Sequence, residues 1–438
     1  MEENLLNRIG LRKEEKAFET RVALIPDQVK SLVEKHGIEF VIEPSSQRAF
    51  EEKEFEEVGA TATPLKGSGV PVVLGIKEMP IDFFEKDVAY IFFSHTIKGQ
   101  KYNMPMLQHI MNTGSTLIDY ERVVDDKGRR MIFFGNWAGM AGISDTFHVL
   151  GERLEMEGIK PNPFAGMRTT LELKGLEAVK EEFKSLGKRI HEQGLPEELT
   201  PFVVGFAGYG NVSRGAQLIF DLLPHETVQP EDLRHLEPKR NLLYKCVFKE
   251  EDMVEPREST KKFELQDYYK LGNADYRGVF HNYVQYLTII MNCIYWTNKY
   301  PRLITKDFIR EHWKEKSRKL RVIGDISCDI GGAIEFTLDC TTPAKPAFVY
   351  LIKEDRIELG VKGDGPVIMA VDNLPCELPR EASTSFGETL LEFIPALAKA
   401  DFKASFEDLD LPREIKDAII VYRGKLTKNF EYLNQYLN

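Results

Sequence analysis

The stretch that decides the fold, Phe202–Gly215, reads FVVGFAGYGNVSRG. It begins as a short apolar run typical of a buried strand, then passes through a glycine turn into a helix expected over 212–223. Gly208 permits the tight turn, Gly210 lets a pyrophosphate approach the backbone, and Ser213 stands where a third small residue usually lies. A purely structural turn is the alternative. The predicted dinucleotide-binding residues of this turn are Gly208, Gly210, Asn211, Val212 and Ser213.

The strand after this turn bears on the choice of cofactor. Its end is expected near residues 226–229, where the ribose of a bound dinucleotide should lie. An NAD-binding protein usually carries an acid at that tip, whereas Gln229 occupies it here. The residues therefore favour NADP(H), with NAD(H) as the alternative, and Gln229 is a candidate cofactor-binding residue.

Two polar side chains follow apolar strands in the first part of the chain. Lys77, with Glu78 beside it, follows the strand predicted over 70–75, and His95 ends the strand predicted over 88–94. Burial lowers the pKa of a lysine toward the range in which it exchanges protons. The alternatives are a surface lysine that holds a turn and a hydrogen-bonded core histidine. Together with the glycine turn, the pair suggests hydride chemistry at a carbon–nitrogen bond.

Basic residues near the N-terminus are candidates for binding carboxylates. Arg21 is embedded in the apolar stretch Thr20–Pro26, where a merely solvated guanidinium is unexpected, and a fixed arginine suits bidentate capture of a carboxylate. Glu121 and Arg130 flank a predicted turn and could bind an amine and a carboxylate, or form a structural ion pair. The candidate substrate-binding residues are Arg12, Lys16, Arg21, Glu78, Glu121 and Arg130.

Composition restricts the class of protein. The 438 residues exceed one compact core, so two domains are expected, and the net charge of −11 argues against nucleic acid or an anionic membrane as a partner. The longest apolar stretch, Tyr286–Trp296, is too short to span a bilayer, and the N-terminus lacks a signal-peptide layout. A cytoplasmic protein is expected, or a mitochondrial one if a transit peptide precedes this sequence.

Five cysteines without CxxC spacing predict free, mostly buried thiols rather than a metal site or a disulfide.

Alternating strand and helix signals predict an α/β protein with two Rossmann-like parallel-sheet domains and the active site in the cleft between them. Residues 1–140 plus 383–438 are expected to form the substrate domain, and residues 141–382 the dinucleotide-binding domain. The predicted strands are 38–42, 70–75, 88–94, 115–119, 131–134, 202–207 and 321–326. The predicted helices are 27–36, 50–58, 104–112, 138–157, 212–223 and 281–297, with 230–275 partly irregular and 383–438 an amphipathic helical tail.

Several stretches resemble the alanine dehydrogenase/transhydrogenase superfamily. They are Arg21–Pro26, Lys77-Glu78 with Pro80, and His95 for its N-terminal domain, and Asp325–Gly332 and Asp372–Pro375 for its cofactor domain. The resemblance implies that Arg21 holds a substrate carboxylate, that Lys77 and His95 handle protons and the carbonyl oxygen, and that Asp329 lies by the nicotinamide. By the same resemblance, Asn373 belongs to the cofactor site.

Other stretches are similar to the lysine-forming saccharopine dehydrogenases, and more so to the lysine-ketoglutarate reductase half of aminoadipic semialdehyde synthase. Those stretches include Phe93–Lys98, Gly135–Gly139, Gly208–Ala216, Asn292–Trp296 and Pro301–Leu303. The similarity implies reductive condensation of L-lysine with 2-oxoglutarate to saccharopine, and the reverse, with NADPH. It also implies small-molecule partners and a separate glutamate-forming dehydrogenase for the next step, and leaves a homo-oligomer open. The alternatives are an alanine dehydrogenase-like enzyme with another amine and keto acid, and a non-catalytic dinucleotide-binding regulatory protein.

Overall fold

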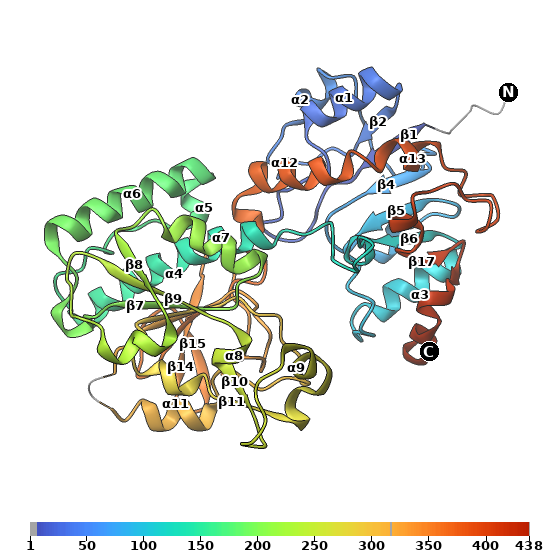
Figure 1. The fold of residues 1–438 in the computed structure, drawn as a ribbon. Helices are drawn as coiled ribbons and strands as arrows, with labels where there is room; N and C mark the ends of the chain where they lie inside the picture. The colour runs from blue at the N-terminus through green and yellow to red at the C-terminus, as the bar shows by residue number, and fades with distance from the viewer. Residues whose placement is uncertain (1–6, 316–317, 438) are drawn as a thin grey trace. The chain divides into compact units, whose positions relative to one another are not determined.

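The computed structural model describes residues 7–315 and 318–437, which fall into two compact units (Figure 1). The first unit is Met1–Phe134 with Pro379–Asn438, and the second is Gly135–Leu378. The chain therefore leaves the first unit after residue 134, where 140 was expected, and returns to it after residue 378, where 382 was expected.

An eight-stranded sheet forms the centre of the first unit, in the order β18-β17-β6-β5-β4-β1-β2-β3. The strands from β6 to β3 are parallel, whereas β17 runs antiparallel to β6 and β18 antiparallel to β17. The bounds are β1 Arg8–Leu11, β2 Glu39–Ile42, β3 Thr61–Ala62, β4 Val72–Leu74, β5 Ala89–Phe92, β6 Thr116–Asp119, β17 Ile419–Tyr422 and β18 Lys425–Leu426. Because the parallel strands share one direction, their C-terminal ends lie along one edge of the sheet.

Helices cover both faces of this sheet. One apolar cluster joins the sheet to α1, α12 and α13, and a second joins its other face to α3. Helix α1 shows why such elements form where they do, since Pro26 occupies its first turn and Gly37 ends it in the left-handed conformation (φ 63°). The bounds are α1 Pro26–His36, α2 Glu52–Glu56, α3 Met104–Thr113, α12 Pro379–Leu390, α13 Ile394–Lys399 and α14 Arg413–Lys416.

The second unit also contains an eight-stranded sheet, in the order β15-β14-β16-β13-β12-β7-β9-β8. The strands from β16 to β8 are parallel, and β14 and β15 add an antiparallel edge. The bounds are β7 Val203–Ala207, β8 His225–Val228, β9 Leu243–Phe248, β12 Ile289–Asn292, β13 Val322–Asp325, β14 Ala347–Leu351, β15 Arg356–Leu359 and β16 Val367–Met369. A separate antiparallel pair consists of β10 Val254–Pro256 and β11 Tyr276–Gly278.

Two glycine contacts hold helices α4 and α7 against each other. A Cβ added to Gly139 of α4 would lie 2.0 Å from the carbonyl oxygen of Val212, and one added to Gly215 of α7 would lie 2.0 Å from that of Asn136. Only glycine permits this approach, so Gly215 serves the contact between these helices. The helices of the unit are α4 Gly135–Glu157, α5 Thr170–Leu173, α6 Leu176–Gln193, α7 Asn211–Phe220, α8 Glu250–Met253, α9 Leu265–Leu271, α10 His281–Val284 and α11 Lys306–His312.

One sequence prediction in the second unit was wrong. The helix predicted over 281–297 is only the short α10, and the chain then forms β12, a central strand whose four residues are all buried. The segment 230–275, predicted to be partly irregular, also contains β9, which pairs directly with β7. Short apolar runs fit a buried strand and a buried helix equally well, because periodicity does not distinguish them.

Two predictions in the first unit were also wrong. Residues 131–134 form no strand; Phe134 instead stacks on Phe386 of α12, with ring centroids 4.6 Å apart. The tail 383–438 is not helical throughout, because β17 and β18 lie within it and extend the first sheet. The other predicted helices and strands are confirmed to within a few residues at each end. Within the described ranges, no helix combines the length and apolar character needed to cross a membrane.

Candidate active site

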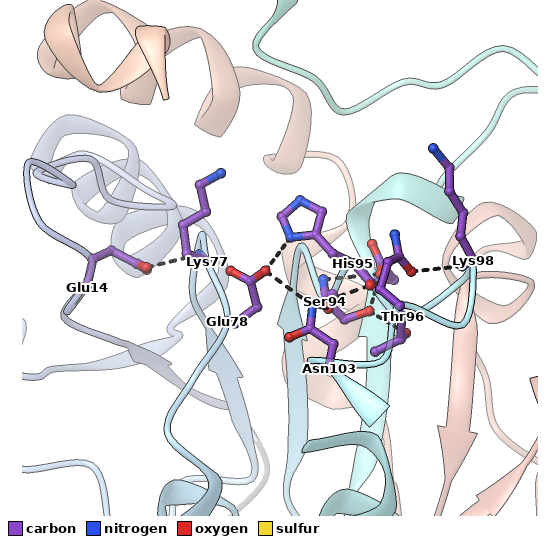
Figure 2. Close-up of polar contacts among 10 residues, drawn as sticks. Glu14, Lys77, Glu78, Ser94, His95, Thr96, Lys98 and Asn103 are labelled. Atoms are coloured by element: carbon purple, nitrogen blue, oxygen red, sulfur yellow. Dashed lines mark hydrogen bonds and ion pairs between the residues drawn. The ribbon is translucent and has the colours of Figure 1, made fainter. Parts of the chain in front are cut away.

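Lys77 and His95 lie side by side beyond two paired strands of the first unit (Figure 2). Strands β4 and β5 are parallel neighbours, and the pairing continues past them, since the Phe93 N–H donates to the Ile76 carbonyl at 3.1 Å. Figure 2 shows the two side chains rising from these strand ends with Glu78 between them. The structure thus brings the two predicted acid/base residues into one cluster.

Glu78 and His95 form a hydrogen-bonded pair. The Nδ1 atom of His95 lies 2.5 Å from Oε1 of Glu78, and both side chains are partly exposed, at 30% and 29%. Burial alone would raise the pKa of Glu78, but the hydrogen bond and charge of His95 outweigh it and lower that pKa to about 2. The carboxylate therefore stays ionised at neutral pH and orients the imidazole through Nδ1, so that Nε2 is the nitrogen directed elsewhere.

The backbone at His95 is in the left-handed region, with φ 48°. Such a conformation is uncommon for a residue other than glycine and persists where the surroundings hold it. Asn103 provides that hold, because its side-chain amide donates to the carbonyls of Ser94 and His95 at 3.0 and 3.3 Å, and to Glu78 at 3.4 Å. Asn103, from the start of α3, was not predicted, and no pattern in the sequence indicates it.

The environment of Lys77 disfavours its charge. Burial of the side chain is the main cause of a lowered pKa, and the positive charges of Arg21 and Lys16 lower it further. Glu19 and Glu78 oppose that shift without cancelling it. Lys77 is therefore a lysine that can release a proton more readily than a solvated one, which is what proton transfer near neutral pH needs.

A buried carboxyl group supports the turn that carries Lys77. Glu14 accepts the backbone N–H groups of Ile76 and Lys77 at 2.6 and 2.9 Å. Burial, followed by the charge of Glu19, raises the pKa of Glu14 to about 7. The only hint of Glu14 in the sequence is its place between Arg12 and Lys16, and its role as a support for the turn was not predicted.

The raised pKa of Glu14 predicts a pH-dependent stability. The folded protein binds this proton more tightly than the unfolded chain, so the free energy of unfolding should fall as the pH rises from about 4.5 to 7, by on the order of 3 kcal/mol from this group. Glu14→Gln, which mimics the protonated form, should remove part of that fall. Thermal denaturation of both proteins between pH 5 and 8 measures it, with exposed Glu56→Gln as the matched control. A wild-type melting temperature that rises over this range and is unaffected by Glu14→Gln would contradict the expectation.

A second buried carboxylate holds the start of the His95 turn. Asp119, at the end of β6, accepts the Ser94 N–H at 3.2 Å and the Ser94 hydroxyl. Burial raises the pKa of Asp119 to about 6, against the hydrogen bond from Ser94, which lowers it. Three adjacent strands, β4, β5 and β6, thus each supply at least one carboxylate or proton-transfer group at the same edge of the sheet.

The predicted substrate-binding arginines are engaged with acidic partners. Arg21 is 2% exposed; its Nε donates to Glu19 at 2.7 Å, and its guanidinium lies 4.1 Å from the centre of the Phe134 ring. Arg12 is equally buried, donates to Glu15 at 3.0 Å, and lies over the Phe83 ring. Arg21 and Lys16 are close enough to act on the charge of Lys77, whereas Arg12 packs against Phe83 in the other apolar cluster.

Glu121 and Arg130 form an ion pair of 2.6 Å, the structural alternative considered for them. Arg130 is 43% exposed and Glu121 17% exposed, so the pair remains reachable from solvent. Tyr102 was not predicted, and most of its surface is exposed. Partial burial of the phenol raises its pKa, Glu78 and Glu121 raise it further, and Lys16 opposes the shift. Tyr102 therefore lies beside the same cluster of charged residues.

In the second unit, the glycine turn borders a cavity of about 390 Å³. Gly208 has φ 93°, a conformation that favours glycine, and the space beside the α-carbon of Gly210 is open. The cavity is lined by Gly208, Tyr209, Gly210, Glu250, Met253, Tyr268, Tyr269, Cys293, Ile294, Tyr295 and Tyr300. Asn211, Val212 and Ser213 begin α7 directly behind the turn, so its N-terminal N–H groups fit a pyrophosphate.

The strand next to β7 in the sheet is β9, not β8. The residues that follow β9 therefore lie beside the glycine turn. The structure places Gln229 beyond the exposed edge strand β8, separated from β7 by β9. Glu250, two residues after the end of β9, lines the cavity with Gly208 and Gly210 and accepts a hydrogen bond from Tyr269 at 2.7 Å. Strand order is a tertiary property that the sequence pattern does not show.

Acidic and amide side chains end the next strands of this sheet. Asp325, fully buried at the end of β13, accepts Asn292 Nδ2 at 2.8 Å and the Thr337 hydroxyl at 2.6 Å. Burial raises the pKa of Asp325 to about 6. Asp329 lies four residues further and is exposed, and Asn373 follows β16 and is buried. Both follow the C-terminal ends of strands parallel to β7. Among the residues described, no group of three or more His, Cys, Asp or Glu side chains could hold a metal ion.

Comparison with known proteins agrees with this architecture. Sequence models of the N-terminal and C-terminal domains of alanine dehydrogenase/PNT match residues 10–141 and 277–429. The alpha-aminoadipic semialdehyde synthase of Arabidopsis thaliana is 37% identical over 95% of this chain, which spans only 40% of that protein. The saccharopine dehydrogenase [NAD(+), L-lysine-forming] of Emericella nidulans is 29% identical over 88% of this chain and 90% of its own length. A solved L-alanine dehydrogenase has the same fold, with a TM-score of 0.61, 20% identity and 98% of each chain covered.

Proposed function

Because the chain belongs to the alanine dehydrogenase/PNT family, we propose that it reductively condenses L-lysine with 2-oxoglutarate to saccharopine, and catalyses the reverse, with a nicotinamide dinucleotide. The observation that carries the proposal is the cluster of Lys77 and the Glu78–His95 pair, together with relatives whose names include lysine-forming saccharopine dehydrogenase. The nicotinamide supplies or accepts the hydride, and the residues of this chain bind, orient and transfer protons.

The reaction requires several proton transfers on the substrates. The lysine ε-amine adds to the ketone, the carbinolamine loses water to give an imine, and reduction of the imine carbon gives a secondary amine. Two groups of different pKa suit such a sequence. We assign them to Lys77, whose charge is disfavoured by burial, and to His95, which Glu78 orients through Nδ1.

Substrate charge accounts for the basic residues around this cluster. Saccharopine carries three carboxylates, and carboxylates are bound well by arginine and lysine held in fixed positions. Lys16 and Arg21 lie within electrostatic reach of Lys77, and Arg130 is the more exposed member of its pair with Glu121. We assign carboxylate binding to these three residues, with Arg12 in a supporting position against Phe83.

The second unit carries the dinucleotide in this proposal. The cavity beside Gly208 and Gly210 and the N-terminus of α7 suit a pyrophosphate. Gln229 favoured NADPH, but Glu250 lines the cavity instead, and a carboxylate there accepts hydrogen bonds from ribose hydroxyls and repels a 2′-phosphate. We therefore propose NADH as the preferred donor. Asp329 and Asn373, beyond β13 and β16, are assigned to the nicotinamide end.

The assay is oxidation of NADH or NADPH by the purified protein with lysine and 2-oxoglutarate, omitting each component in turn. Turnover that needs the dinucleotide, lysine and the keto acid together supports the proposal. Amination of pyruvate by ammonia without lysine would identify an alanine dehydrogenase-like activity instead. Dinucleotide binding without oxidation of NADH or NADPH in the presence of either amine and keto acid pair would identify a regulatory protein and overturn the proposed reaction.

Cofactor choice is tested by Glu250→Gln in the same assay. Loss of the charged hydrogen-bond acceptor should reduce the preference for NADH over NADPH, measured as the ratio of kcat/KM values, by about 10- to 100-fold. Glu251→Gln, one residue along and outside the cavity lining, is the matched control. A wild-type preference for NADPH that Glu250→Gln leaves unchanged would remove Glu250 from this role and restore the preference indicated by Gln229.

A further inference from the structure

Two of the five cysteines lie together at the base of the loop that carries Asp329. The Sγ atoms of Cys328 and Cys340 are 3.1 Å apart, and both residues are partly buried free thiols. The Cys328 thiol also lies 2.9 Å from the carbonyl oxygen of Ala370, and that of Cys340 lies 3.7 Å from the carbonyl oxygen of Cys328. The other three cysteines, Cys246, Cys293 and Cys376, are buried.

The loop between these cysteines is already closed by hydrogen bonds. The Gly331 N–H donates to the Thr337 carbonyl at 2.8 Å, and the Thr337 hydroxyl donates to Asp325 at 2.6 Å. The Cys328 N–H donates to the same Asp325 at 3.2 Å. The two sulfur atoms are therefore held near each other by the fold, and joining them does not require the loop to open.

We propose that Cys328 and Cys340 form a reversible dithiol/disulfide site, oxidised by low-molecular-weight disulfides, that tethers the Asp329 loop. The proposal rests on the proximity of the two sulfur atoms, their partial exposure and the closed loop between them. The mechanism described for Lys77 and His95 makes no use of either thiol. Only the consequence for dinucleotide binding rests on the proposed function.

Cys340 is the attacking group in this chemistry. The hydrogen bond from the Cys328 thiol lowers the pKa of Cys340, whereas the same hydrogen bond and burial raise that of Cys328, and the thiolate is the nucleophile. The Cys340 thiolate attacks one sulfur of the small disulfide, forming a mixed disulfide and releasing one thiolate. Cys328 then loses its proton and attacks the Cys340 sulfur, which releases the second thiolate. The small disulfide gains two electrons and leaves as two thiols, and the protein loses two electrons and two protons.

Closing the bond should shift the loop that carries Asp329. A disulfide holds its sulfur atoms about 2 Å apart, so Cys328 must move away from the Ala370 carbonyl and toward Cys340. Asp329 is the next residue, and the carbonyls of Gly331 and Gly332 are held by Arg302 at 2.9 and 3.1 Å. Because Arg302 holds Gly331 and Gly332 in place, movement of Cys328 changes the turn that contains Asp329. We expect the oxidised protein to bind NADH about tenfold more weakly.

Mass spectrometry of the full chain tests the site. The protein is incubated with oxidised glutathione, unreacted thiols are alkylated, and peptides are mapped before and after dithiothreitol. The expected result is a crosslink between Cys328 and Cys340 that dithiothreitol reverses. Cys328→Ser should stop at a glutathione adduct on Cys340, and Cys340→Ser should slow the loss of thiols about tenfold. Cys246→Ala, in the interior of β9, should react like the wild type.

The outcomes test the crosslink between Cys328 and Cys340 separately from its effect on NADH binding. No crosslink in the wild type, a crosslink between other cysteines, or an unchanged rate in Cys340→Ser would overturn the proposal, whether or not the protein turns over lysine. Circular dichroism of each variant separates loss of fold from loss of a thiol. NADH titration of the reduced and oxidised wild type, followed by fluorescence, then tests the consequence. Equal affinities would show that the crosslink does not act on the dinucleotide site.

Discussion

Replacing Lys77 with methionine is expected to lower kcat for saccharopine formation by about 10²- to 10⁴-fold while the protein stays folded. Methionine has similar length and suits a buried site, so the change removes the proton-transfer group with little effect on packing. The reason for the large effect is the lowered pKa of Lys77, which burial and Arg21 produce and which makes this lysine suited to proton transfer. Steady-state kinetics over pH 6 to 10 measure it, and the variant should lose the limb of the pH profile that reports Lys77.

The matched control is Lys86→Met. Lys86 is exposed and precedes β5, at the opposite end of the strand from His95, so its charge is remote from the cluster. Its kcat should equal that of the wild type. A Lys77→Met enzyme with kcat within a few-fold of the wild type would show that Lys77 is a structural lysine at a turn, the alternative that the sequence left open.

His95→Gln is the second change with a large expected effect, again about 10²- to 10⁴-fold in kcat. Glutamine can keep a hydrogen bond to Glu78 but cannot take up and return a proton. Glu78→Gln should lower kcat by less, because Glu78 acts by orienting His95 through the 2.5 Å contact. Because Glu78 is a positioning residue, Glu78→Gln should add little to His95→Gln in the double variant.

Three measurements separate proton transfer by His95, and its positioning by Glu78, from a structural role of these residues. His36→Gln, at the exposed end of α1, should leave kcat unchanged. Thermal denaturation of the His95 and Glu78 variants should show whether they remain folded. Additive losses in the double variant would mean that Glu78 contacts the substrate on its own account, and a fully active His95→Gln enzyme would exclude His95 from proton transfer.

The proximity of Lys77 and His95 could be predicted from the sequence because its signal is local. Lys77 and His95 each follow a short apolar strand, and parallel strands that are neighbours bring their C-terminal ends together. The supports of the pair could not be predicted in this way. Glu14 and Asn103 come from separate segments. They support the pair through hydrogen bonds to backbone groups that they contact only after folding.

The second unit shows a different limit of prediction from the sequence. The glycine turn after β7 was predicted correctly, since strand, turn and helix are consecutive in the chain. The partner of β7 was not, because β9 inserts between β7 and β8 and brings Glu250 to the turn in place of Gln229. Strand β12 was missed because an apolar run of this length fits a buried helix as well as a strand.

The division of the chain between the two units sets an order for folding during synthesis. The second unit is a single uninterrupted stretch, Gly135–Leu378, so every strand of its sheet is synthesised before α12. The sheet of the first unit is completed later, because β17 pairs with β6 across about three hundred residues of intervening chain. Until β17 arrives, β6 is an unprotected sheet edge that another nascent chain could pair with. A chain whose synthesis stops between Leu378 and Ile419 would therefore contain every strand of the second unit and leave β6 unpaired in the first.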